Sequence, residues 1–191
     1  MQLLIGQVRY AVHTLLFEEA NPLQKRWALF AASAAAAQFR RKIPASVGLR
    51  IDWLLTMAAG DARVGLTWLP GRKNVGRILE ESLDALRASS VTSVICLLAR
   101  DEFARYGVEG LLDAYRARGI DVLHTPTLDG RSPSATELHE SVACIRERFE
   151  QKRNVVIHCV GGIGRAGTVA SCWLKSRGFT TDNAIAKVRE I

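Results

Sequence analysis

Residues 158–165 have the sequence HCVGGIGR and decide the fold, because they join a strand to a helix through a glycine-rich turn. Residues 154–157 (NVVI) before them are typical of a short buried strand, and residues 166–177 after them have the composition of a helix. In a turn of this kind, successive backbone N–H groups point into the loop and the helix dipole adds positive potential. The stretch therefore predicts an oxyanion site between a strand and a helix.

A cysteine and an arginine stand at the two ends of this turn. The positive potential favours the thiolate form of Cys159, and the planar fork of Arg165 fits two phosphate oxygens at once. A thiolate beneath a bound phosphate is placed for attack on phosphorus, so Cys159 is the candidate nucleophile. The alternative, a glycine-rich turn around an inert cysteine, is disfavoured by the combination of strand, glycines, arginine and helix. The residues expected to bind the phosphate are Val160, Gly161, Gly162, Ile163, Gly164 and Arg165.

An aspartate in a loop 30 residues before the cysteine is the candidate general acid. Asp129 lies in residues 125–133 (TPTLDGRSP), where two prolines and a glycine indicate an exposed loop. Ser134 and Glu137 then form a capping-box pattern that begins a helix. Cleavage of a phosphomonoester needs a proton for the leaving oxygen and then a base for water, and one carboxyl group can supply both. The alternative for an Asp-Gly pair is a plain turn.

The histidine before the cysteine is expected to orient the loop. Neighbours in a strand point to opposite faces, so His158 is not placed to take a proton from Cys159. We expect the His158 side chain to hydrogen-bond nearby backbone and keep the loop amides directed inward.

Residues 66–190 resemble the cysteine-dependent dual-specificity protein phosphatases, and within them the cyclin-dependent kinase-associated phosphatase branch. The resemblance implies a protein tyrosine phosphatase-like fold and a phosphocysteine mechanism without metal or cofactor. It also implies a protein substrate phosphorylated on serine, threonine or tyrosine, without identifying that protein. The segments that carry it are residues 69–71 (LPG), 98–103 (LARDEF), 106–108 (YGV), 111–115 (LLDAY), 119–120 (GI), 129–130 (DG) and 158–165.

Two departures from the family pattern bear on activity. The family usually has Ser or Thr after the arginine, with a hydroxyl that hydrogen-bonds the cysteine sulfur, whereas this chain has Ala166. Slower phosphoenzyme turnover is expected unless Thr168 or a water substitutes. This leaves open an alternative function, a phosphate-recognition module with little turnover. The family fold also continues beyond residues 188–191, so we expect the chain to lack the last helix.

Other chemistries of a cysteine-arginine loop are less well supported. Arsenate reduction and sulfur transfer are disfavoured by the placement of Asp129, and arsenate reduction would also need resolving thiols near the loop. Residues 160–164 contain no lysine, which favours a monophosphorylated protein over a polyanionic lipid head group.

Composition and charge limit the class of protein. A chain of 191 residues with 48% apolar residues can bury one full core with an appendage. The four cysteines, Cys96, Cys144, Cys159 and Cys172, show no paired spacing, and a reactive thiol needs a reducing compartment, so a cytoplasmic location is expected. The net charge of +7 is concentrated in residues 1–50, which contain seven Lys or Arg and two Glu. No aromatic–basic interleaving indicates a nucleic-acid partner, and the oligomeric state is not indicated.

The order of elements predicts an α/β fold with a mainly parallel central sheet flanked by helices. Residues 47–191 are expected to form the catalytic domain, and residues 1–46 a basic helical extension of unknown role. Residues 27–39 are too short an apolar stretch to span a bilayer. A helix docked on the domain is favoured there over one lying on an anionic membrane. Strands are expected at 64–68, 91–98, 120–124 and 154–158, and helices at 74–88, 101–118 with a break at Gly107, 135–152 and 166–177, followed by one more helix.

Overall fold

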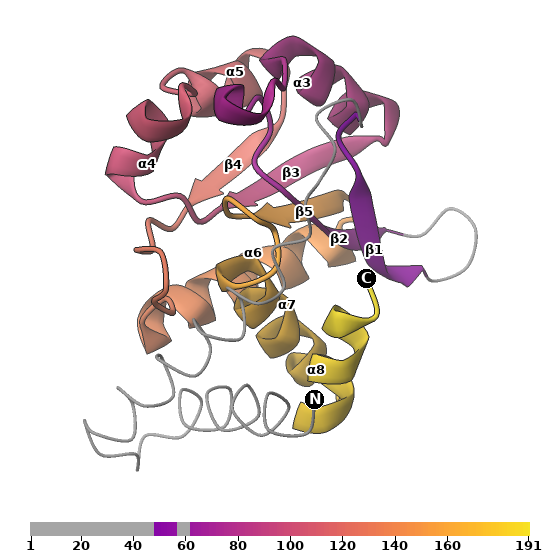
Figure 1. The fold of residues 1–191 in the computed structure, drawn as a ribbon. Coiled ribbons are helices and arrows are strands. Elements are labelled where there is room, and N and C mark those ends of the chain that lie inside the picture. The colour runs from indigo at the N-terminus through magenta and orange to yellow at the C-terminus, as the bar shows by residue number, and fades with distance from the viewer. Residues whose placement is uncertain (1–47, 57–61) are drawn as a thin grey trace.

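The computed structural model describes residues 48–56 and 62–191 and has one five-stranded sheet (Figure 1). The strand order is β1-β2-β5-β3-β4. β1 pairs antiparallel with β2, and every other pairing is parallel, so the predicted mainly parallel sheet is confirmed. The predicted N-terminal extension lies outside the described residues. The strands are β1 (Ile51–Thr56), β2 (Arg63–Thr67), β3 (Val91–Cys96), β4 (Asp121–His124) and β5 (Asn154–His158).

Helices cover both faces of the sheet, as the α/β pattern predicts. In Figure 1 one face carries α3 (Leu79–Ala88), α4 (Arg100–Tyr106) and α5 (Leu111–Ala117). The opposite face carries α6 (Ala135–Glu150), α7 (Arg165–Ser176) and α8 (Thr181–Arg189). The central strand β5 therefore lies between two helical layers, and the chain leaves its carboxyl end directly into the loop that precedes α7.

One sequence prediction about the elements was wrong, and one strand was missed. The single helix expected at 74–88 is a 3-10 turn, η1 (Lys73–Val75), followed by α3. The two are separate because Gly76 adopts a left-handed backbone, with φ of 72°, and Ile78 is extended. The edge strand β1 was not predicted at all.

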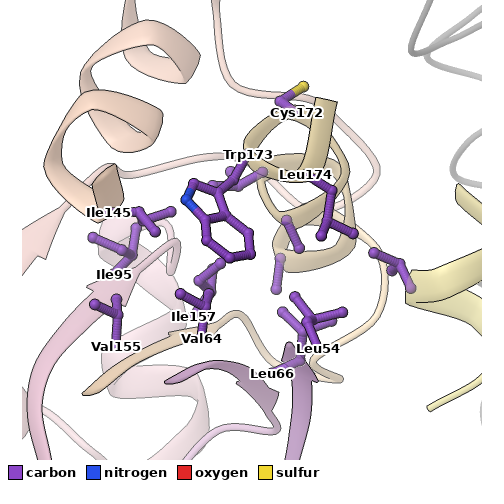
Figure 2. Close-up of a cluster of buried hydrophobic side chains, with 14 of the residues drawn as sticks. Leu54, Val64, Leu66, Ile95, Ile145, Val155, Ile157, Cys172, Trp173 and Leu174 are labelled. Atoms are coloured by element: carbon purple, nitrogen blue, oxygen red, sulfur yellow. The ribbon is translucent and has the colours of Figure 1, made fainter. Parts of the chain in front are cut away.

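The core consists of two clusters, one on each face of the sheet. Val155 and Ile157 point into the cluster under α6 and α7, whereas Val156, between them, packs on the opposite side. Side chains of a strand alternate between faces, so this strand is apolar on both of them, as a central strand of a parallel sheet must be. Trp173 of α7 is fully buried at the centre of the cluster under α6 and α7 (Figure 2). Each such large side chain stabilises the fold by about 1.5–3 kcal/mol.

The helices of the described residues are not membrane spans. None within 48–56 and 62–191 is both long and apolar enough to cross a bilayer.

Candidate active site

The glycine-rich loop follows β5 and is fixed against the end of β2. The backbone N–H of Leu69 donates to the carbonyl of Val160 at 3.1 Å. Gly162 has a φ of 74°, and a Cβ there would lie 2.5 Å from the backbone oxygen of Thr67, so only glycine fits. By contrast, a Cβ at Gly161 would meet nothing within 4 Å. One glycine of the loop is thus required by close packing of the loop on the sheet.

The thiol of Cys159 lies at the base of this loop. It is a free cysteine, and the residue is only 3% exposed. The loop ends where α7 begins, at Arg165, and Ile163 stands at its rim with 43% of its surface exposed. The predicted sequence of strand, loop and helix is therefore present.

Arg165 is held by a buried carboxylate that the sequence analysis did not select. Its Nη1 and Nη2 atoms donate to the two oxygens of Glu102, at 2.6 and 2.9 Å. Nη1 also donates to the backbone oxygens of Leu97 at 3.2 Å and Thr127 at 2.6 Å. Burial opposes the charge, but the hydrogen bonds that Arg165 donates to Glu102 and the electrostatic attraction of Cys159, Glu102 and Asp129 outweigh it and raise the pKa of Arg165. The guanidinium is consequently a fixed cation close to Cys159.

Glu102 is itself fixed at the start of α4. It is 1% exposed, and its Oε2 accepts from the backbone N–H of Ala99 at 2.8 Å. A carboxylate is almost never fully buried unless it is paired, so its side chain marks a structural ion pair. The sequence signal for Glu102 was its place in residues 98–103, a segment used for family resemblance and not for a role.

Asp129 lies close to this arginine but in a different environment. Its Oδ1 is 3.5 Å from Nη2 of Arg165, while its side chain is 60% exposed. The loop is attached at its base by the Thr127 carbonyl, and its tip turns at Gly130, where φ is 73° and Arg131 N–H donates to Leu128 at 3.0 Å. The structure thus brings Asp129, Arg165 and the Cys159 loop together, although Asp129 precedes the cysteine by 30 residues.

His158 connects the loop backbone to α5. Its Nδ1 donates to the carbonyl of Cys159 at 3.2 Å, so its Nε2 accepts from the hydroxyl of Tyr115, 3.0 Å away. Burial lowers the pKa of His158 to about 4, so the ring is neutral at physiological pH. The expected hydrogen bond to nearby backbone is therefore present. Tyr115 belongs to the core cluster that contains Val156, and Cys159 belongs to the cluster under α6 and α7. The two side chains at 158 and 159 therefore point to opposite faces of the sheet.

The position after the arginine contains no hydroxyl group near the sulfur. Ala166 is fully buried, and the hydroxyl of Thr168 donates to the Gly164 carbonyl at 3.1 Å, within its own helix. Thr168 therefore directs its hydroxyl to the helix backbone.

Two of the other cysteines are poor nucleophiles. Burial raises the pKa of Cys96 and of Cys172 to about 12 in each case, which keeps both protonated. Within the part of the chain that the structure describes, no group of three or more His, Cys, Asp and Glu side chains could hold a metal ion.

Two solved structures of phosphatases have a similar fold. Kinase-associated phosphatase, in a form with its catalytic cysteine replaced by serine, superposes with a TM-score of 0.70 and 28% identity, over 76% of this chain and 85% of that one. Tk-PTP in its active form superposes with a TM-score of 0.56 and 34% identity, over 69% and 80% of the two chains. With a buried cysteine and arginine in one loop, these relatives define a cysteine-dependent protein phosphatase of the dual-specificity type.

Sequence comparison gives the particular family. The sequence profile described as cyclin-dependent kinase inhibitor 3 matches residues 43–185. The cyclin-dependent kinase inhibitor 3 of Rattus norvegicus is 32% identical over 148 residues, which cover 75% of this chain and 70% of the relative. The chain belongs to the cyclin-dependent kinase inhibitor 3 family, and its substrates are phosphorylated proteins.

Proposed function

We propose that this phosphatase works through a phosphocysteine intermediate, with Cys159 as nucleophile, Arg165 as phosphate ligand and Asp129 as general acid and base. The observation that carries the proposal is the position of Arg165. Its guanidinium is fixed by Glu102, interacts electrostatically with Cys159, and lies 3.5 Å from the Asp129 carboxylate of another loop. Arg165 therefore lies near both of the other groups that the chemistry needs, Cys159 and Asp129.

In the first step the thiolate of Cys159 attacks phosphorus. An S–P bond forms, the bond from phosphorus to the leaving oxygen breaks, and Asp129 donates its proton to that oxygen. In the second step water attacks phosphorus, Asp129 accepts a proton from it, and the sulfur leaves as a thiolate. Inorganic phosphate and the original enzyme result, and no metal or external oxidant enters the balance.

The arginine keeps one edge for the substrate. Nη1 donates to Glu102 and to the carbonyls of Leu97 and Thr127, and Nη2 donates to Glu102 and lies 3.5 Å from Asp129. Nε has no hydrogen-bond partner among the described residues. The Nε–Nη2 edge of a guanidinium matches two phosphate oxygens in plane, and the amides of residues 160–165 meet the others. His158 supports this arrangement by holding the carbonyl of Cys159, so that the amides stay directed inward.

The substrate we propose is a single phosphoryl group on a protein side chain. Residues 160–164 contain no lysine to meet further phosphates, which favours one phosphate over a polyanionic head group. Because relatives are named for cyclin-dependent kinases, a phosphorylated protein kinase is the first protein substrate to test. Four free cysteines support a reducing compartment, and we propose the cytoplasm.

One observation favours a second candidate, a phosphate-binding module with little turnover. Ala166 offers no hydroxyl to the departing sulfur, and Thr168 is hydrogen-bonded to Gly164. The family relatives do not favour this candidate. It predicts binding of a phosphopeptide without phosphate release.

The test is phosphate release from a small aryl phosphate in the presence of EDTA, for the wild type and for Cys159→Ser. We expect turnover in the wild type and a loss of roughly 10⁴-fold or more in the variant, as for other deleted nucleophiles. Cys172→Ser is the matched control and is expected to retain activity, because Cys172 lies within α7 and outside residues 158–165. A folded wild type that binds phosphopeptide and releases no phosphate would instead favour the binding module.

A further inference from the structure

A pocket whose lining contains no residue of the cysteine loop lies between the start of α3 and the connection from α4 to α5. Its volume is about 490 Å³, and it is partly open to solvent. Parts of residues 71–80 form one wall and residues 107–110 form the other. The side chain of Lys73 packs against Gly107, so it joins the two walls. A Cβ at position 107 would lie 2.6 Å from the lysine Cδ, and the glycine leaves that space to the lysine.

Arg77 lines this pocket as a buried cation without an acceptor. The residue is 8% exposed, and its guanidinium stacks over the Trp68 ring at 4.1 Å from the centroid. Its Nε and Nη2 atoms are sealed from water and have no hydrogen-bond partner, and neither does the neighbouring indole nitrogen of Trp68. Three of the five such buried side-chain atoms in the described residues belong to this one stacked pair. Burying donors and a charge without an acceptor is strongly unfavourable, and stacking on an aromatic ring offsets only part of it.

The carboxylates at the pocket leave Arg77 unneutralised. Glu80 and Glu109 line the pocket, but neither forms an ion pair with Arg77 within the described residues. Glu80 lies 3.9 Å from Arg118 instead. Burial, together with the positive charge of Arg72, lowers the pKa of Arg77, which is the direction expected of a cation that lacks a partner. The missing interaction is therefore an oxyanion.

We propose that this pocket binds one carboxylate of an acidic side chain on a protein partner, through an ion pair with Arg77. Nη1 is not among the sealed atoms, so it makes the first contact with an incoming oxygen. Glu80 and Glu109 place negative charge at the pocket and disfavour a polyphosphate, whereas a single carboxylate tolerates them.

The partner also presents an apolar side chain next to the acidic one. Ile78 is 54% exposed and is one of only three large apolar side chains exposed in the described residues. It lines the pocket beside Arg77, together with the buried Val108. An acidic residue followed by leucine would pair its carboxylate with Arg77 and pack its leucine on Ile78. No residue of the catalytic loop lines this pocket, so binding to it can be measured without turnover.

The test is NMR of the Arg77 Nε–H and the Trp68 Nε1–H signals during titration with the dipeptides Ac-Glu-Leu-NH₂ and Ac-Gln-Leu-NH₂. We expect the glutamate dipeptide to shift both signals to saturation with a Kd on the order of millimolar, and the neutral dipeptide to cause no saturating shift. Inorganic phosphate serves as the second arm, and we expect weaker shifts from it. Absence of any shift with the glutamate dipeptide, or tighter binding of phosphate, would overturn the proposal.

Variants separate a binding role from a structural one. Arg77→Met keeps a flexible side chain against Trp68 and removes the unpaired charge, so we expect a Tm higher by a few degrees and no dipeptide binding. Arg77→Lys keeps the charge and loses the fork, so binding weakens severalfold. Arg105→Met, at an exposed arginine paired with Asp101, is the control and leaves binding unchanged. A lower Tm for Arg77→Met, with dipeptide binding retained, would show that Arg77 serves the fold and not a ligand.

Discussion

The two loops that meet at the site differ sharply in how the chain holds them. In residues 158–165, Cys159 and Arg165 are almost completely buried, and the loop is tied to β2, to Tyr115 and to Glu102. In the Asp129 loop, only the base is fixed, and the acid side chain is 60% exposed. The groups that hold phosphate are thus built into the core, whereas the group that moves a proton stands at the surface.

This difference indicates a division of labour. Electrostatic groups stabilise a transition state best when they are positioned in advance, and a buried, paired arginine meets that condition. A general acid must reach the leaving oxygen of different substrates, and it needs only hydrogen-bonding distance at the moment of reaction. Changes in the buried loop should therefore affect stability and activity together, and changes in the acid loop should affect activity alone.

Asp129→Asn should separate activity from stability most clearly. We expect kcat to fall by about 10²–10⁴, because the leaving oxygen loses its proton donor. The free energy of unfolding should change by less than about 0.5 kcal/mol, because the side chain is exposed. Steady-state kinetics and urea unfolding measure the two effects. Asp113→Asn, at another exposed acid, is the control. Full activity in Asp129→Asn would require a different acid.

Glu102→Ala should affect both properties. It leaves the buried Arg165 charge without its carboxylate, and loss of one partner of a buried pair costs about 3–5 kcal/mol. For a domain of this size, that lowers Tm by roughly 10 °C. Activity should also fall, because the phosphate ligand loses its position. Asp113→Ala breaks the exposed pair with Arg116 and should cost less than about 1 kcal/mol. Equal effects of the two substitutions would contradict the assigned rigidity of the loop.

Stability of the buried loop should also depend on pH through His158. Its pKa is about 4 in the folded protein and about 6.5 when unfolded, so the unfolded state binds more protons between these values. Stability from the neutral ring is complete above pH 6.5 and is lost as pH falls through 4, by about 3 kcal/mol. Urea unfolding at several pH values measures it, with His158→Asn as the comparison. The same slope in wild type and variant would assign the pH dependence to other groups.

Ala166→Ser is expected to have the smallest effect. A hydroxyl at this position can hydrogen-bond the sulfur as it leaves phosphorus, and one bond to a charged group corresponds to about a 10-fold gain in rate. If phosphoenzyme hydrolysis limits turnover, kcat rises and the pre-steady-state burst diminishes. A burst of unchanged size with unchanged kcat would show that the missing hydroxyl does not limit the enzyme.

Features that depend on neighbouring residues could be predicted from the sequence, and features that depend on distant residues could not. Residues 154–158 form a strand within the predicted bounds, and Ser134 and Glu137 form the predicted capping box, because both signals are local. Cys159, Arg165 and Asp129 stood out by residue type and by loop composition. Glu102 did not, because its role depends on a pairing with Arg165 across 63 residues. The edge strand β1 pairs only with β2. The helix expected at 74–88 is interrupted at Gly76, a glycine that was not used as a break, unlike Gly107.

The proposed mechanism requires a phosphocysteine at Cys159, and trapping this intermediate is the decisive experiment. Asp129→Ala should be mixed with an aryl phosphate, quenched in acid within the first turnovers and digested for mass spectrometry. We expect one added phosphoryl group on the peptide that contains Cys159, and we expect it to be absent in the double variant with Cys159→Ser. Phosphate release without any adduct on Cys159, or an adduct on another residue, would contradict it.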